Sequence, residues 1–242
     1  LGRDFDAMAD RLQTMVASRQ RLLRDVSHEL RSPLARIRVA LELARRKGSE
    51  GQAELERIEQ EAERLDALLG HVLQLARLDD PAAPARFECV DLTALLDGIA
   101  EDARLEAQAA GCRLVRAAAD PLPVRADPTL LRSGLENVVR NAVRYTEVGT
   151  AVEITQALVE AWVRISIRDH GPGVPPQALE RIFEPFFRVA DARERDSGGE
   201  GIGLAITAHV ARVHGGRVQA SNAPGGGLQV DFDLPRASGG SA

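Results

Sequence analysis

Residues 26–34 read Val-Ser-His-Glu-Leu-Arg-Ser-Pro-Leu and lie in the middle of a long run of helical periodicity. Apolar side chains around this stretch recur at spacings that are mostly three, four or seven, as in a helix with one buried stripe. The stripe consists of Phe5, Met8, Leu12, Met15, Leu23, Val26, Leu30, Ile37 and Leu41. At about 100° per residue, His28 points roughly 155° away from the stripe. We therefore predict a long helix that presents His28 to solvent.

A second helix is expected after the turn-like sequence Lys-Gly-Ser-Glu-Gly at residues 47–51. Its apolar stripe consists of Leu55, Ile58, Ala62, Leu65, Leu69, Val72 and Ala76. Two helices joined by a short loop form an antiparallel hairpin. One hairpin leaves its stripe half covered, whereas two hairpins paired as a four-helix bundle would bury it. The sequence therefore predicts a homodimer.

The pattern changes after residues 79–84, a proline- and alanine-rich break that reads as a linker. Helices are expected at 91–110, 127–145 and 202–214, with Asp91 and Asp127 as N-caps and Pro128 as the first helical residue. Strands are expected at 112–115, 122–125, 151–159, 161–169, 218–221 and 228–234. Helices mixed with antiparallel strands favour an α+β sandwich.

Composition narrows the classes of function. The 242 residues carry a net charge of −5 with no broad basic field, so nucleic acid is not an expected partner. Cys89 and Cys112 form no CxxC pair, which argues against a zinc or redox site and fits a reducing cytoplasm. No apolar run approaches the roughly 20 residues of a membrane span, and no signal peptide is visible. The chain begins at Leu1 with helical residues, so we expect a fragment of a longer protein.

The helical block at 26–34 has the chemistry of a phosphoryl acceptor. A neutral imidazole nitrogen is a competent nucleophile, and the reference pKa of about 6.5 leaves histidine mostly neutral near pH 7. The neighbouring Glu29 is suited to accept the other ring N–H and to stabilise the growing positive charge. Pro33 cannot donate to the carbonyl of Glu29, so a bend is expected beside His28. Most lone surface histidines have no function, so this interpretation depends on the blocks that follow.

The helix expected at 127–145 has two distinct faces. Leu131, Leu135, Val138 and Ala142 form a packing face. About 130° around lie Asn137, Asn141 and Arg144, with Tyr145 between the two faces. An amide oxygen is a hard ligand for Mg²⁺, and arginine adds charge for phosphates. The alternative is a pair of solvated asparagines on an ordinary amphipathic helix.

Three further blocks suit a nucleotide. Residues 169–174, Asp-His-Gly-Pro-Gly-Val, follow a strand: Asp169 is suited to accept from an exocyclic amine of adenine, and glycines let the backbone approach a ring closely. The alternative is an ordinary turn. Residues 183–188 are Phe-Glu-Pro-Phe-Phe-Arg, and 189–197 read as a mobile lid. The glycine-rich run 198–204 leads into a helix, whose N-terminal N–H groups favour phosphate.

Together the blocks resemble the H, N, G1, F and G2 boxes of bacterial sensor histidine kinases, in the family's order and spacing, from about Arg3 to Pro235. The wording around His28 and Asn141 is most similar to the Cpx-type envelope-stress sensor kinases. The resemblance implies that His28 is phosphorylated, Glu29 is its acid/base partner and Asn141 ligates Mg²⁺. It implies a nucleotide site made of Asn137, Asn141, Arg144, Tyr145, Asp169, Gly171, Gly173, Phe187, Arg188, Gly199, Gly201, Ile202, Gly203 and Leu204.

The resemblance further implies ATP-dependent autophosphorylation, with ATP and Mg²⁺ as cofactors, and transfer to an aspartate on the receiver domain of a response regulator. The implied organisation is the end of a HAMP signalling helix at 1–18, a dimerisation and histidine-phosphotransfer hairpin at 19–80, a linker at 81–86, a Bergerat-type ATP-binding sandwich at 87–236 and a disordered tail at 237–242. The intact protein would be embedded in the bacterial inner membrane, with this portion in the cytoplasm.

Three residues depart from the family pattern. Ser32 replaces the Thr or Asn associated with phosphatase activity on the regulator, although it retains a hydroxyl. His170 replaces Asn or Asp, which suggests a mild pH dependence of ATP binding. Glu200 places a negative charge near the expected phosphates.

Three alternatives stay open at this point. One is an ATPase of the same fold, like the chaperone, mismatch-repair and gyrase relatives, which the last three boxes alone would permit. A second is a dimeric scaffold whose site has decayed, for which Glu200 and His170 are the only hints. A third is an enzyme whose phosphatase activity on the regulator dominates.

Overall fold

The computed structural model describes residues 2–47, 51–78, 85–189 and 201–236, with side chains described in 23–46, 51–76, 85–189 and 201–236. The chain separates into two compact units, Leu1–Leu73 and Gln74–Ala242. Each unit is described by itself.

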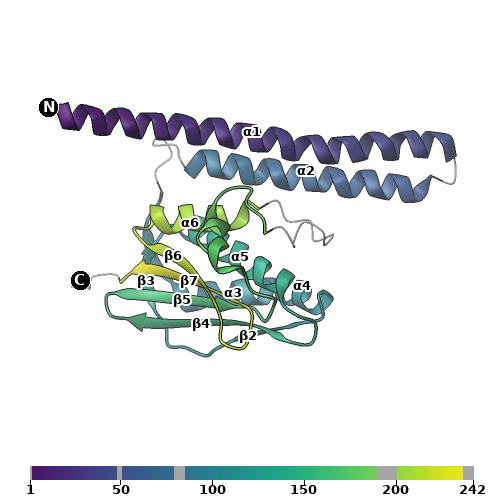
Figure 1. Cartoon of the computed structure of the whole chain (residues 1–242). Coiled ribbons are helices and arrows are strands. Elements are labelled where there is room, and N and C mark those ends of the chain that lie inside the picture. Colours follow the sequence, from purple (N-terminus) through teal and green to yellow (C-terminus); the bar gives the residue numbers. More distant parts are fainter. Residues whose placement is uncertain (1, 48–50, 79–84, 190–200, 237–242) are drawn as a thin grey trace. The chain divides into compact units, whose positions relative to one another are not determined.

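The first unit is a helical hairpin made of α1 (Gly2–Lys47) and the greater part of α2 (Gln52–Leu78) (Figure 1). Helix α1 runs through Pro33 and is continuous across residues 18 and 19, where a domain boundary was expected. Of the predicted turn at 47–51, residues 48–50 lie outside the described residues.

The buried line of this hairpin differs from the predicted apolar stripe. Buried positions include Pro33 and Ala40 on α1 and Glu54, Glu61 and Leu68 on α2, so they recur every seventh residue. None of the described members of the stripe predicted from hydrophobicity is buried within one chain: each is half-buried or exposed. Its exposed members include Leu23, Leu41, Leu55 and Leu69.

The second unit is built on a five-stranded sheet with the strand order β2-β4-β5-β7-β6. The strands are β2 (Arg113–Arg116), β4 (Ala151–Val159), β5 (Trp162–Arg168), β6 (Arg217–Asn222) and β7 (Leu228–Pro235). β2 pairs parallel with β4, and the other pairs are antiparallel. A separate antiparallel pair joins β1 (Glu88–Asp91) to β3 (Pro123–Ala126).

Helices pack against one face of the sheet, which gives the predicted α+β sandwich (Figure 1). They are α3 (Leu92–Asp102), α4 (Arg104–Ala109), α5 (Pro128–Tyr145) and α6 (Gly203–Val213), and short 3₁₀ turns follow β5 at Pro176–Ala178 and Arg181–Phe183. Alternation along β5 buries Val163, Ile165 and Ile167 in the core beside Phe232 of β7. The opposite side of β5 is polar, as expected for a sheet covered on one face.

Both predicted N-caps are confirmed. Oδ1 of Asp91 accepts from the N–H groups of Thr93 (2.9 Å) and Ala94 (3.4 Å), and Oδ1 of Asp127 accepts from those of Thr129 (3.1 Å) and Leu130 (3.0 Å). The second carboxylate oxygen of Asp127 accepts from the backbone N–H of Arg86 at 2.8 Å.

Two features of this unit differ from the prediction. The expected helix 91–110 is interrupted at Ala103, which ends α3 and precedes α4. Strand β1 was not predicted, because only one of its four residues is even half-buried and it is defined by pairing with the distant β3.

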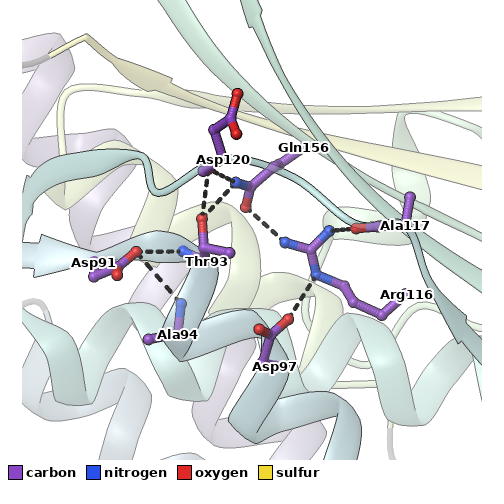
Figure 2. Close-up of polar contacts among 8 residues, drawn as sticks. All are labelled: Asp91, Thr93, Ala94, Asp97, Arg116, Ala117, Asp120 and Gln156. Carbon is purple, nitrogen blue, oxygen red and sulfur yellow. Dashed lines mark hydrogen bonds and ion pairs between the residues drawn. The ribbon is translucent and has the colours of Figure 1, made fainter.

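A network of hydrogen bonds joins the end of β2 and the loop that follows it to α3 and β4 (Figure 2). The amide nitrogen of Gln156 donates to Thr93 Oγ1 (2.7 Å) and to the carbonyl of Asp120 (3.1 Å). The amide oxygen of Gln156 accepts from Arg116 at 2.9 Å, and Arg116 lies 3.3 Å from Asp97. The edge strand β2 is thereby tied to both layers of the sandwich.

Candidate active site

The predicted phosphoryl acceptor lies on an accessible surface of α1. The side chains of His28, Glu29 and Ser32 are all exposed in this chain, as helical periodicity indicated for His28. His28 and Ser32 are four residues apart, which places them on the same side of the helix one turn from each other. Among the described residues of the hairpin, the imidazole is accessible to an incoming phosphoryl group.

One charged cluster links this surface to α2. Arg36 donates to Ser32 Oγ at 2.6 Å and makes two 2.8 Å bonds to the two carboxylate oxygens of Glu61. Arg64 adds a 3.0 Å bond to the same carboxylate. The hydrogen bonds from Arg36 hold the pKa of Glu61 below its ordinary value although the carboxylate is nearly buried. The sequence analysis did not identify Glu61, since it looked like one of several surface glutamates.

The candidate adenine-binding residue Asp169 is buried at the end of β5, with 3% of its surface exposed. Its Oδ1 accepts from the backbone N–H groups of Gly171 (2.8 Å) and Leu228 (3.0 Å). Burial raises the pKa of the Asp169 carboxyl above its ordinary value, and these two hydrogen bonds oppose the rise. Because both bonds use Oδ1, Oδ2 is the atom left for a donor such as an exocyclic amine.

The turn after Asp169 packs against the C-terminal end of α5. A Cβ on Gly171 would lie 2.2 Å from the carbonyl oxygen of Tyr145, so only glycine fits there. The backbone N–H of His170 donates to Thr146 Oγ1 at 3.0 Å. The blocks at 136–146 and 169–174, distant in sequence, are therefore neighbours.

The glycine-rich block completes the arrangement. The carbonyl of Gly201 accepts from the N–H of Phe186 at 2.8 Å, which joins this block to residues 183–188. A Cβ on Gly203 would lie 3.2 Å from the side-chain oxygen of Asn137 on α5. The described parts of the four blocks are thus linked: 169–174 and the glycine-rich block contact α5, and 183–188 contacts the glycine-rich block. Gly199 and Glu200, and all but the first residue of the expected lid, lie outside the described residues.

The start of α6 has the properties of an anion site. The N-cap residue, Ile202, makes no side-chain capping bond, so the first N–H groups of the helix are not satisfied by a cap. Ile202 is fully buried, main chain included, and Leu204 is half-buried. Close packing against Asn137 places this helix start beside one of the amides predicted for the nucleotide site.

The remaining predicted residues lie around this centre. The guanidinium of Arg144 is 5.9 Å from the Tyr145 ring centroid, a cation–π distance. Phe187 stacks under Arg181 at 4.3 Å, and Arg188 is half-buried.

The residues of the second unit provide a donor set that suits Mg²⁺. Within the described ranges, no group of three or more His, Cys, Asp or Glu side chains could hold a metal ion. Mg²⁺ bound with a nucleotide needs only one or two protein oxygens, because phosphates and water supply the rest. The half-buried amide of Asn141, on the face of α5 that carries Asn137, fits this requirement.

The chain matches two protein-family models. Residues 18–81 match the His Kinase A (phospho-acceptor) domain, and residues 126–238 match the Histidine kinase-, DNA gyrase B-, and HSP90-like ATPase family. The sensor histidine kinase CpxA of Escherichia coli (strain K12) is 41% identical over 235 residues, which are 97% of this chain and 50% of CpxA. The chain belongs to the sensor histidine kinases.

Solved structures agree with this assignment of the sensor kinase. Full-length ShkA in complex with AMPPNP is 33% identical, with a TM-score of 0.65, over 89% of this chain and 45% of ShkA. The mycobacterial sensor histidine kinase MprB is 30% identical, with a TM-score of 0.52, over 62% of this chain and 97% of that one. The predicted fold class and the Cpx-type resemblance are both confirmed. The sensor kinase spans about half the length of the curated relatives it matches.

Two of the alternatives can now be weighed for the sensor kinase. The phospho-acceptor match at 18–81 covers His28 and argues against a gyrase-like or chaperone-like ATPase. His170, one of the hints of decay, has its ring nitrogen 3.0 Å from Glu153.

None of the helices in the described part of the chain combines the length and apolar character that crossing a bilayer requires.

Proposed function

We propose that this chain binds MgATP in its second unit, transfers the γ-phosphoryl group to His28 and passes it to an aspartate on the receiver domain of a response regulator. The observation that carries the proposal is the linking of four sequence-distant blocks by contacts, in a chain that also presents an exposed histidine within a phospho-acceptor domain. The ATP-binding family and the nucleotide complex of ShkA support the choice of nucleotide.

The chemistry follows from the residue types. A ring nitrogen of His28 attacks the γ-phosphorus in line, a P–N bond forms and the bond to the β–γ bridging oxygen breaks, so that ADP leaves. Glu29 accepts a hydrogen bond from the N–H of the other ring nitrogen and stabilises the positive charge that develops on the ring. Asn141 would hold Mg²⁺, which offsets the charge on the phosphates. The start of α6 receives phosphate oxygens, and Asp169 accepts from the adenine amine.

We also propose that the hairpin functions as a homodimer. Several large apolar side chains of α1 and α2 are exposed in a single chain, and their clustering on two paired helices indicates a surface that a partner covers. They include Leu23 (63%), Leu34 (50%), Val39 (60%), Leu55 (52%), Leu69 (46%) and Leu73 (57%). A second hairpin would cover them in a four-helix bundle.

Further parts of the proposal concern the intact protein. The domain limits 19–80 and 87–236, the preceding HAMP helix and the linker at 81–86 are proposed from the family resemblance. So are attachment to the inner membrane and phosphatase activity on the regulator, in which Ser32 would take part.

The test is to incubate the chain with γ-labelled ATP and Mg²⁺. The expected product is protein carrying acid-labile, base-stable label. His28→Gln should abolish the label, whereas His71→Gln, a matched change on α2, should retain it. Asn141→Ala should reduce the initial rate by about tenfold or more. Release of free phosphate without labelled protein would instead indicate an ATPase, and no binding of MgATP would indicate a scaffold.

A further inference from the structure

The turn proposed to bind adenine rests on the hairpin that joins β6 to β7. A Cβ on Gly227 would lie 1.9 Å from the carbonyl oxygen of Asp169. A Cβ on Gly226 would lie 3.8 Å from the carbonyl oxygen of Gly171. Gly227 also has a φ of +89°, where side chains are strained. The backbone of the hairpin thus packs directly against the backbone of the turn.

One side chain adds a specific link between the two. The amide oxygen of Asn222, the last residue of β6, accepts from the N–H of Val174 at 2.9 Å. Its amide nitrogen donates to the carbonyl of Val174 at 2.7 Å. A single side-chain amide therefore satisfies both backbone groups of Val174, as a neighbouring strand would.

The close approach of Asn222 also accounts for the glycine beside Val174. A Cβ on Gly173 would lie 2.7 Å from Asn222 Oδ1, and the φ of Gly173 is +70°. A larger residue at 173 would both strain the backbone and displace the amide. Sequence alone had explained this glycine only by its closeness to a planar ring.

We infer that Asn222 is a positioning residue for nucleotide binding, an inference that rests on the function proposed above. The hairpin fixes the turn at both ends. The carbonyl of Leu228 accepts from the N–H of Asp169, the N–H of Leu228 donates to the Asp169 side chain, and Asn222 pairs with Val174. The separation between the adenine-reading carboxylate and the far end of the turn is therefore set by β6 and β7. Asn222 acts through Val174 and does not touch the nucleotide.

The test measures the affinity of the full chain for MgADP by calorimetry. Asn222→Ala should raise the Kd about five- to tenfold, since two hydrogen bonds that order the turn are lost. In autophosphorylation the KM for ATP should rise by a similar factor, with kcat unchanged at saturating ATP. Asn222→Asp should not restore affinity, because a carboxylate cannot donate to the carbonyl of Val174.

A matched control separates positioning from general stability. Gln156→Ala removes another amide with several hydrogen bonds in the same unit, within the network of Figure 2. It should leave the MgADP affinity unchanged. The inference is overturned if Asn222→Ala binds MgADP like the unchanged chain, or if Gln156→Ala weakens binding equally. An unchanged chain that does not bind MgADP would refute the proposed function itself.

Discussion

Replacing Arg36 by alanine should destabilise the helical hairpin in a manner that depends on pH. The Glu61 side chain is only 11% exposed and accepts two 2.8 Å bonds from Arg36, whose own side chain is 51% exposed. Losing the partner of a fully buried carboxylate costs about 3–5 kcal/mol, whereas a surface pair contributes up to about 1 kcal/mol. Because Arg36 is half in water and Arg64 stays bonded to Glu61, we expect a loss of about 1–2 kcal/mol at pH 7.

The pH dependence follows from the direction of the shift. With Arg36 present, the pKa of Glu61 is lowered. The pair therefore contributes its full stability at pH values above the ordinary glutamate pKa of about 4.3, and this stability is lost as the pH falls through the folded-state pKa. Without Arg36, burial favours the neutral acid, and protonation then relieves the variant. The difference between the two proteins should therefore shrink as pH is lowered from 7 to 4.

Native-state hydrogen exchange, resolved to peptides of α1 and α2, measures this difference without contributions from the second unit. Arg38→Ala is the matched control, since Arg38 is an exposed arginine two residues further along α1. It should change the exchange free energy by less than about 0.5 kcal/mol. Equal effects of the two substitutions, or a loss at position 36 that is the same at pH 7 and pH 4, would refute this account of the cluster.

Three further predictions concern the second unit. Gly171→Ala forces a methyl group against the Tyr145 carbonyl. It should lower the free energy of unfolding in urea by about 1–3 kcal/mol and should also weaken nucleotide binding; unchanged stability would contradict the close approach. In the unchanged chain, MgADP affinity should fall as acid protonates the Asp169 carboxyl, whose pKa is raised by burial. Asp169→Asn should lower the affinity at neutral pH and remove this pH dependence; a pH profile shared by both proteins would contradict this role. Arg164→Ala leaves the buried carboxylate of Asp233 with Arg217 as its remaining partner and should destabilise by about 2–3 kcal/mol by calorimetry, which a Tm unchanged at pH 7 would refute.

Local signals made much of the fold predictable from sequence. Asp127 followed by Pro128 marked the start of α5, and the alternation at 151–169 marked the β4–β5 hairpin, because caps and period-two patterns depend on neighbouring residues. The split at Ala103 gave no signal, since alanine is the best helix former. Strand β1 exists through its pairing with β3 and carries no pattern of its own.

The candidate site divides in the same way. The blocks around Asn141, Asp169 and Gly203 were recognisable because their chemistry is contiguous in sequence. Glu61 and Asn222 were not, since their importance arises from partners 25 and 48 residues away. The hairpin stripe indicates the face that one chain leaves exposed, whereas the line buried within the chain includes charged residues that hydrophobicity cannot identify.

The two oxygens of the Asp127 carboxylate have different partners, and this decides where an isolated nucleotide-binding fragment should begin. One oxygen caps α5, and the other binds the main chain of Arg86, ahead of the first strand. An excised nucleotide-binding fragment that begins at Phe87 would lose that donor and weaken the helix that carries Asn141. A fragment that begins upstream of Ala85 keeps the bond, so it should be more stable than one that begins at Phe87.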